Sequence, residues 1–181
     1  MSGEATIRRA VAADAAALAA LAESTFVAAF GAQNRPEDLA LHIRRSYGEA
    51  IQLGEILDPA FVTFVAERDG RLRAYAQLAT GVAGKGPASI PGTQPIEIRR
   101  FYVDAAWHGR GLAQRLMTTV LEFCTGAGAD TVWLGVWEEN PRGIAFYRKC
   151  GFTVVGSHVF VLGSDPQRDV LMARSADRAL P

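Results

Sequence analysis

The sequence predicts a mixed α/β fold with a central, mostly antiparallel sheet that carries helices on both faces. Strand patterns of antiparallel type come first, and strands alternate with helices after residue 95. A length of 181 residues suits one well-buried domain and is short for two. We therefore expect a single domain over 1–181, with an ordered core at 5–174 and a frayed tail at 175–181.

Composition and charge disfavour two kinds of partner. Nineteen basic and nineteen acidic residues give no net charge, which argues against a broad electrostatic grip on nucleic acid or an anionic membrane. We see no apolar run near the roughly 20 residues of a membrane span and no signal-peptide pattern, so we expect a cytoplasmic protein. Cys124 and Cys150 form neither a disulfide framework nor a metal-ligand cluster.

The first half of the chain is expected to form a strand, two helices and a hairpin. Apolar residues recur at helical spacing from Leu18 until Gly31 ends the pattern, and Asp69-Gly70 is typical of a tight hairpin turn. The expected elements are a strand at 6–9, a helix capped by Asp14, a helix at about 37–49 after Pro36, and strands at 61–67 and 73–79. Residues 81–95 are rich in Gly, Pro and Ser and should form a mobile connection.

The second half is organised around a strand, a glycine-containing turn and an amphipathic helix at 96–124. Leu112, Leu116 and Val120 begin an apolar helical stripe. Beyond it we expect a strand buried on both faces at 131–137, a helix at 142–149 between Asn140-Pro141 and Gly151, strands at 152–155, 158–162 and 169–174, and a turn at 163–167.

The turn before the long helix has the features of an anion site. Gly109 and Gly111 let the backbone approach a ligand, the first helical amides are unpaired, and Arg110 adds positive charge. The turn lacks the Gly-Lys-Ser/Thr of a P-loop, and Gln114 stands where a dinucleotide fingerprint needs a third glycine. A phosphate-binding turn and a plain structural turn both remain open at this point.

Two motifs make the chain similar to the GNAT acetyltransferase superfamily. The family's pyrophosphate signature, Arg/Gln-x-x-Gly-x-Gly/Ala, stands here as HGRGLA at 108–113, with His108 as its one departure. The second signature, an Asn followed by Ala, Phe-Tyr and Gly-Phe, is matched by Asn140 and residues 145–152. Residues 136–152 and 157–174 look like the bacterial spermidine/spermine acetyltransferase branch.

The resemblance implies acetyl-CoA as co-substrate, no metal, and a central strand that splays from the strand at 134–136. Amides at 109–113 would hold the pyrophosphate, and a bulge near Arg99 or Arg100 would free a strand edge for the pantetheine arm. Asn140 would bond that arm, cap the next helix, or do both. The implied cofactor-binding residues are Phe101, Tyr102, Val103, His108, Gly109, Arg110, Gly111, Leu112, Ala113, Gln114, Asn140, Phe146 and Tyr147.

The resemblance also assigns catalytic roles to Tyr147 and Glu97. A phenol, with a reference pKa of about 10, can protonate the leaving CoA sulfur, and the alternative for Tyr147 is a core position. Glu97 would accept the proton of an alkylammonium, whose pKa of about 10.4 places the neutral amine roughly 4 kcal/mol uphill at pH 7. Its alternative is a cross-strand ion pair with an arginine. His158 is a weaker base candidate, and Cys150 is expected in the core.

The implied reaction is acetyl transfer to a primary amine, with a small polyamine as first candidate. The acidic residues that would attract a polycation, or else form a solvated face, are Glu37, Asp38, Glu55 and Asp58. Two alternatives are acetylation of a protein N-terminus, which needs an open groove, and a non-catalytic acetyl-CoA sensor. The expected partner is a small-molecule amine, without nucleic acid or membrane, and a homodimer through C-terminal strands is a candidate assembly.

Overall fold

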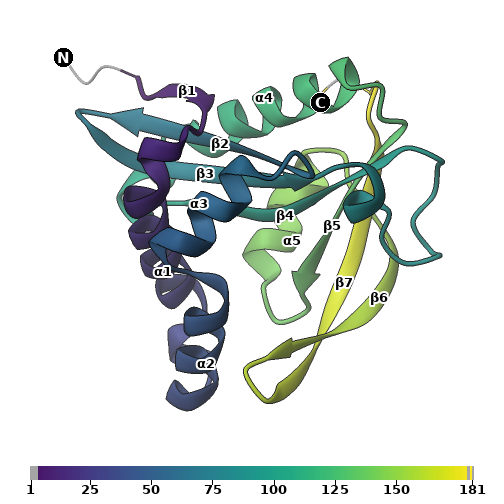
Figure 1. The fold of residues 1–181 in the computed structure, drawn as a ribbon. Helices are drawn as coiled ribbons and strands as arrows, with labels where there is room; N and C mark the ends of the chain where they lie inside the picture. The colour runs from purple at the N-terminus through teal and green to yellow at the C-terminus, as the bar shows by residue number, and fades with distance from the viewer. Residues whose placement is uncertain (1–3, 179, 181) are drawn as a thin grey trace.

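The framework of the molecule is a seven-stranded sheet in the order β1-β2-β3-β4-β5-β7-β6 (Figure 1). The computed structural model describes residues 4–178 and 180. β4 and β5 run parallel and the other neighbouring pairs are antiparallel, which confirms the predicted fold class. The strands are β1 (Thr6–Arg9), β2 (Phe61–Arg68), β3 (Arg71–Ala79), β4 (Pro95–Val103), β5 (Thr131–Trp137), β6 (Thr153–Leu162) and β7 (Asp165–Ser175).

Helices cover both faces of this sheet, as the sequence predicts. Leu116 and Val120 of α4 are fully buried against one face. Leu18 and Phe26 of α1 are buried against the other, and Figure 1 shows α1, α2 and α3 grouped on that side. The α-helices are α1 (Ala15–Phe30), α2 (Pro36–Ser46), α3 (Glu49–Leu57), α4 (Leu112–Gly126) and α5 (Pro141–Lys149).

A bulge in β4 opens the sheet between β4 and β5. In the pairing with β3, residues 77 and 78 face residues 100 and 98, so Arg99 is an extra residue. β4 pairs with β5 only from Pro95 to Glu97. Because a bulge bends its strand, the two strands diverge beyond that point. The bulge and the splayed strand pair expected from the family resemblance are both present.

A polar contact joins α2 to the turn between β6 and β7. The carboxylate of Asp38 accepts hydrogen bonds from the backbone N–H and the hydroxyl of Ser164, both at 2.7 Å. It also pairs with Arg35 at 2.6 Å. Gly163 lies so close that an added Cβ would come within 2.4 Å of the Asp38 Cα. We call these four residues the hairpin latch.

The helix predicted at 37–49 is wrong at its C-terminal end, and α3 was not predicted. Tyr47 is extended, and Gly48 has a φ of 156°, so the helix ends at Ser46. Gln52, only 1% exposed, accepts from the Gly48 amide and donates to the Ser46 carbonyl. A polar residue therefore fills the buried face of α3, and this weakens the apolar pattern that reveals a helix.

The C-terminal strands also differ from the prediction. The strands expected at 152–155 and 158–162 form one strand, β6, which continues through a bulge at Val155. β7 begins at Asp165, so the expected turn at 163–167 shrinks to Gly163-Ser164. Gly163 supplies the left-handed conformation, with a φ of 64°, that so tight a turn requires.

Two segments expected to be loose are held by specific contacts. In the connection at 81–95, the Gly84 carbonyl accepts from the Trp133 indole at 2.7 Å, and the Asp130 carboxylate accepts from the amides of Thr93 and Gln94. In the tail, Ala176 is buried and its amide donates to the Asp130 carbonyl. Fraying therefore does not begin at residue 175.

The first helix contains a longer apolar stretch than we expected from the sequence. Ala12–Gln33 is a helical stretch of 22 residues that contains an 18-residue window with a mean hydropathy of 1.6, long and apolar enough to cross a membrane. One face of the helix, with Leu18 and Phe26, is buried against the sheet, whereas Val27 and several alanines on the other face are exposed. Core packing accounts for the apolar residues of the buried face, and alanines account for the hydropathy of the exposed one.

The hairpin latch gives a stability prediction. Gly163→Ala forces a Cβ onto the Asp38 backbone and should destabilise the protein by about 2–4 kcal/mol, from overpacking and the positive φ together. Gly128→Ala is the matched control, because Gly128 has a φ of 76° but open space around its Cβ position, and should cost about 1 kcal/mol. Urea unfolding measures both. Equal losses would show that the contact with α2 contributes nothing.

Candidate active site

A cavity of 1230 Å³ passes through the splay between β4 and β5. Its lining includes the glycine turn before α4, Tyr147 and Glu97, and residues of α1 on the other face of the sheet. Ligand sites commonly occupy about 300–1,000 Å³, so this volume suits two substrates that meet end to end. We call the α1 side the acceptor chamber, and its lining includes Phe26, Phe30, His42, Tyr47, Glu97, Tyr102, Gly135, Trp137, His158, Phe160 and Asp169.

The turn before α4 presents a row of free backbone amides at the other end. Gly109 and Gly111 adopt φ values of 72° and 77°, and α4 begins without a side-chain cap. Within the described part of the chain, no acceptor pairs with the amides of residues 109–114, and Arg115 is the first that bonds back, to the Gly111 carbonyl. These amides and the positive helix end fit a diphosphate, as expected from the sequence.

The charged side chains at this turn are arranged differently from the prediction. The Arg110 guanidinium lies over the Trp107 ring at 5.6 Å, and Arg110 does not line the cavity. Arg142 of α5 lines it instead and lies 2.9 Å from Nδ1 of His108. With its proton on Nε2, His108 donates to the Val103 carbonyl at 2.9 Å. Arg142 of α5 therefore adds a positive charge to the cavity beside this turn, which the sequence analysis missed.

The edge of β4 that faces β5 is open where the resemblance expects the pantetheine arm. Phe101, Tyr102 and Val103 pair with β3 on one side and have no β5 partner on the other. All three residues line the cavity, as do Leu112, Ala113 and Gln114 at the start of α4. An extended, amide-containing chain can add to such an edge in the manner of a β-strand. The residues present therefore fit acetyl-CoA.

Tyr147 reaches the cavity from α5, which Asn140 caps. The Asn140 Oδ1 accepts from the Gly143 amide at 2.9 Å, so the capping role is confirmed, and Asn140 also lines the cavity. The Tyr147 ring packs at 5.4 Å from Phe146 and at 6.3 Å from Phe101. Its hydroxyl makes no hydrogen bond with another described residue. Burial raises the pKa of Tyr147 above that of a free phenol, so the group stays protonated at neutral pH.

Glu97 lies on β4 at the last position that pairs with β5. Its side chain lines the acceptor chamber, and it makes no hydrogen bond or ion pair with another described residue. The facing residues on the neighbouring strands are Ala79 and Trp133, so the cross-strand ion pair that we considered is not formed. Burial raises the pKa of Glu97, and the charge of Arg99 lowers it by less. A carboxylate in this state is a stronger base than one in water.

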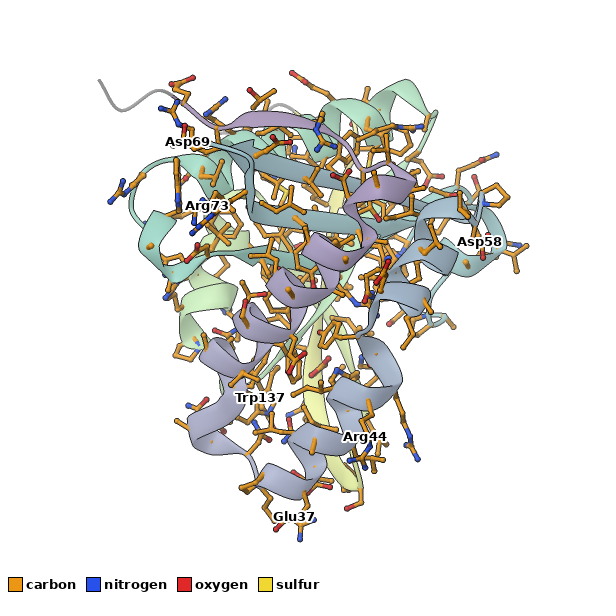
Figure 2. The ribbon with its side chains drawn as sticks, turned by 60° about the vertical axis from the view of Figure 1, so that its left-hand side comes forward. Glu37, Arg44, Asp58, Asp69, Arg73 and Trp137 are labelled. Atoms are coloured by element: carbon orange, nitrogen blue, oxygen red, sulfur yellow. The ribbon has the colours of Figure 1, made fainter. Side chains whose placement is uncertain are left out.

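The acidic residues expected near the acceptor do not face the cavity. Glu55 is paired with Arg100 at 2.6 Å, and Asp38 belongs to the hairpin latch. Figure 2 shows Glu37 at the outer end of α2 and Asp58 at an outer edge of the molecule. Internal pairing and exposure thus account for all four, and none of them lines the acceptor chamber.

The carboxylate that sequence reasoning missed is Asp169 of β7. It lines the chamber beside His158, whose Nε2 lies 3.6 Å from its Oδ2. Burial raises the pKa of Asp169, and His158 opposes this. Gly135 of β5 lets the backbone approach the pair closely, because an added Cβ would lie only 3.2 Å from both atoms. A glycine inside an apolar strand is the signal that marks such an approach.

Comparison with known proteins agrees with this geometry. The model of the Acetyltransferase (GNAT) family matches residues 17–152. An uncharacterized N-acetyltransferase in the pepI 3' region of Lactobacillus delbrueckii subsp. lactis is 33% identical over 156 residues, which cover 86% of this chain and 88% of that protein.

Two solved structures share the fold. PaiA N-acetyltransferase from Thermoplasma acidophilum, in complex with coenzyme A, has a TM-score of 0.78 at 20% identity, covering 96% of this chain and 99% of that one. The spermidine/spermine N-acetyltransferase SpeG from Vibrio cholerae has a TM-score of 0.64 at 20% identity, covering 96% and 95%. The family match and the fold agree with the phosphate turn and the open strand edge, and this chain therefore belongs to the GNAT family of acetyl-CoA-dependent N-acetyltransferases.

Proposed function

We propose that the protein transfers the acetyl group of acetyl-CoA directly to the primary amine of a small molecule. One observation carries the proposal. The free amides before α4 and the acceptor chamber belong to the same cavity, and Tyr147 and Glu97 both line it. The diphosphate would bind at the amides and the acetyl thioester would lie in the splay, so that the amine meets it from the α1 side.

In this scheme Glu97 and Tyr147 move the two protons of the reaction. Glu97 takes the proton that the amine loses as it attacks the acetyl carbonyl, directly or through water. Tyr147 donates its hydroxyl proton to the CoA sulfur as the thioester bond breaks. The raised pKa values of Glu97 and Tyr147 suit these roles. A raised carboxyl pKa favours proton uptake by Glu97, and a raised phenol pKa keeps Tyr147 protonated.

A small acceptor fits the shape of the chamber better than a protein N-terminus. The hairpin latch ties α2 to the β6–β7 turn, and behind it the rings of His42 and Phe160 lie 5.7 Å apart. These contacts join α2 to the β6–β7 hairpin next to the chamber, and this favours a small acceptor over a peptide, which must continue beyond its first residue. A polyamine is the second candidate, supported by the similarity to SpeG, although the four acidic residues expected to attract it lie elsewhere.

We also propose a cytoplasmic protein that assembles as a homodimer through its C-terminal strands. β6 is the outermost strand of the sheet at that end. Val159 and Val161 on it are 67% and 56% exposed, and a row of exposed valines on an unpaired edge is a favourable surface for strand pairing.

The proposed binding of the diphosphate by the amides of residues 109–114, here called the phosphate cradle, is tested by Gly111→Asp. A carboxylate about 5 Å from a phosphate costs roughly 3 kcal/mol at an effective dielectric constant of 20, so KM for acetyl-CoA should rise about 10- to 100-fold. Gly111→Asn is the matched control, because Asn has the same shape and a similar tolerance of positive φ without the charge. Initial rates of CoA release give both values. A KM unchanged by the aspartate would argue against the cradle.

The acid role is tested by Tyr147→Phe. Removing the hydroxyl should lower kcat about 10²- to 10⁴-fold and leave KM for acetyl-CoA within about threefold. Tyr75→Phe serves as control, because Tyr75 is a buried phenol that does not line the cavity. Steady-state kinetics with a panel of primary amines and short peptides measure the change. Binding of acetyl-CoA without turnover of any panel member would favour the sensor alternative.

The base role is tested by the pH dependence of Glu97→Gln. The neutral amine is scarcest at low pH, so the ratio of wild-type to variant kcat should be largest near pH 7 and shrink toward the amine pKa of about 10. Glu97→Asp keeps a carboxylate and should retain the wild-type profile at a lower rate. A ratio that stays constant with pH would remove Glu97 from this role.

A further inference from the structure

The wall of the acceptor chamber is made mainly of aromatic rings. Phe26 and His42 stack with ring centres 4.5 Å apart and planes at 22°. Phe160 lies 5.7 Å from His42, and Phe30 lies 6.0 Å from Trp137. The rings come from α1, α2, β5 and β6, so four elements far apart in sequence contribute to one apolar surface.

This aromatic wall carries no charge at neutral pH. Burial and the nearby charge of Arg100 both lower the pKa of His42, so its ring stays neutral. Arg100 itself is engaged: it donates to Glu55 at 2.6 Å and to the Gln77 side chain at 3.0 Å. Its charge is therefore balanced within the protein, and it offers little attraction to an anionic acceptor.

Two carboxylates in the described part of the chamber have no arginine or lysine partner, and they lie at different levels of the sheet: Glu97 of β4 faces Trp133 of β5, whereas Asp169 of β7 faces Trp137, four residues further along β5. Among the described residues that line the chamber, Glu97 makes no ion pair, and Asp169 is accompanied only by His158. The Asp169 side chain is 14% exposed and lines the cavity, and the Gly135 backbone approaches it so closely that an added Cβ would lie 3.2 Å from its Oδ2. One ammonium group can be held there.

We infer that the acceptor is a small monoamine that carries an aromatic ring a few bonds from its primary amino group. This inference rests on the proposed function and narrows its substrate class. The ammonium lies toward Asp169, whose partner His158 is two residues from Phe160 on β6, and the ring packs among Phe26, His42 and Phe160. Aromatic pairs of this kind favour ring over alkyl groups of similar size. A polyamine would place its second ammonium against a wall that has no carboxylate.

The experiment compares amines at saturating acetyl-CoA by the rate of CoA release. The panel contains 2-phenylethylamine, propylamine, spermidine and a tetrapeptide amide that begins with phenylalanine. We expect kcat/KM for 2-phenylethylamine to exceed the values for propylamine and spermidine at least tenfold. The inference would be overturned if spermidine or the peptide were the preferred substrate, or if all four compounds reacted equally well. Each of these outcomes would leave acetyl transfer itself intact. Turnover of none would overturn the proposed function itself.

Variants test the wall and the carboxylate separately. Phe160→Leu keeps an apolar side chain and should lower the preference for 2-phenylethylamine over propylamine about fivefold, mainly through KM. Val159→Ala is the matched control, because Val159 is the neighbouring residue on β6 and is 67% exposed. Asp169→Asn should raise KM for both amines alike. A preference unchanged by Phe160→Leu, in a variant whose thermal unfolding matches wild type, would contradict the assignment of the ring site.

Discussion

The separation of β4 from β5 after Glu97 is the constraint on which the site depends. One extra residue, Arg99, bends β4 away, and the parallel pairing stops after three residues. The backbone groups of β4 beyond that point have no strand partner, so a ligand can take the place of the missing strand. The same gap connects the two faces of the sheet. The phosphate turn on the α4 side and the aromatic chamber on the α1 side therefore meet in one cavity.

Charge is distributed in the cavity by pairing most ionic groups with one another. The buried pair of Arg100 and Glu55 satisfies two charges that would otherwise dominate the chamber. Breaking such a pair by removing one partner leaves an isolated buried charge, so both residues act as structural groups. Other charged residues that line the cavity include the acidic Glu97, Glu139 and Asp169 and the basic Arg99, Arg142 and Lys149, with Arg142 next to His108 at the glycine turn. The cavity therefore offers both signs of charge, as a cationic amine and an anionic cofactor would require.

The local structure of the site that was predicted correctly depends on local sequence. Asn140 caps its helix through Gly143, three residues away, and the turn glycines Gly109 and Gly111 lie within one stretch and adopt positive φ values, so short-range patterns indicate both features. The residues that were missed or misassigned depend on contacts between distant segments. Asp38 meets Ser164 across 126 residues, and Glu55 meets Arg100 across 45. No periodicity in the sequence shows which carboxylate will form an ion pair or hydrogen bond with a distant residue. The acidic residues were therefore wrongly predicted to lie near the acceptor.

His108 shows why the phosphate turn tolerates a departure from the family signature. The ring does not need to bind the diphosphate, because six consecutive amides from residue 109 remain free for it. Instead it bonds the end of β4 and accepts a hydrogen bond from Arg142. Arg142 and Tyr147 share α5, so this contact ties the helix that carries the proposed acid to the turn that holds the phosphates. A residue that departs from the family signature can thus support the phosphate turn through contacts within the protein, without contacting the diphosphate.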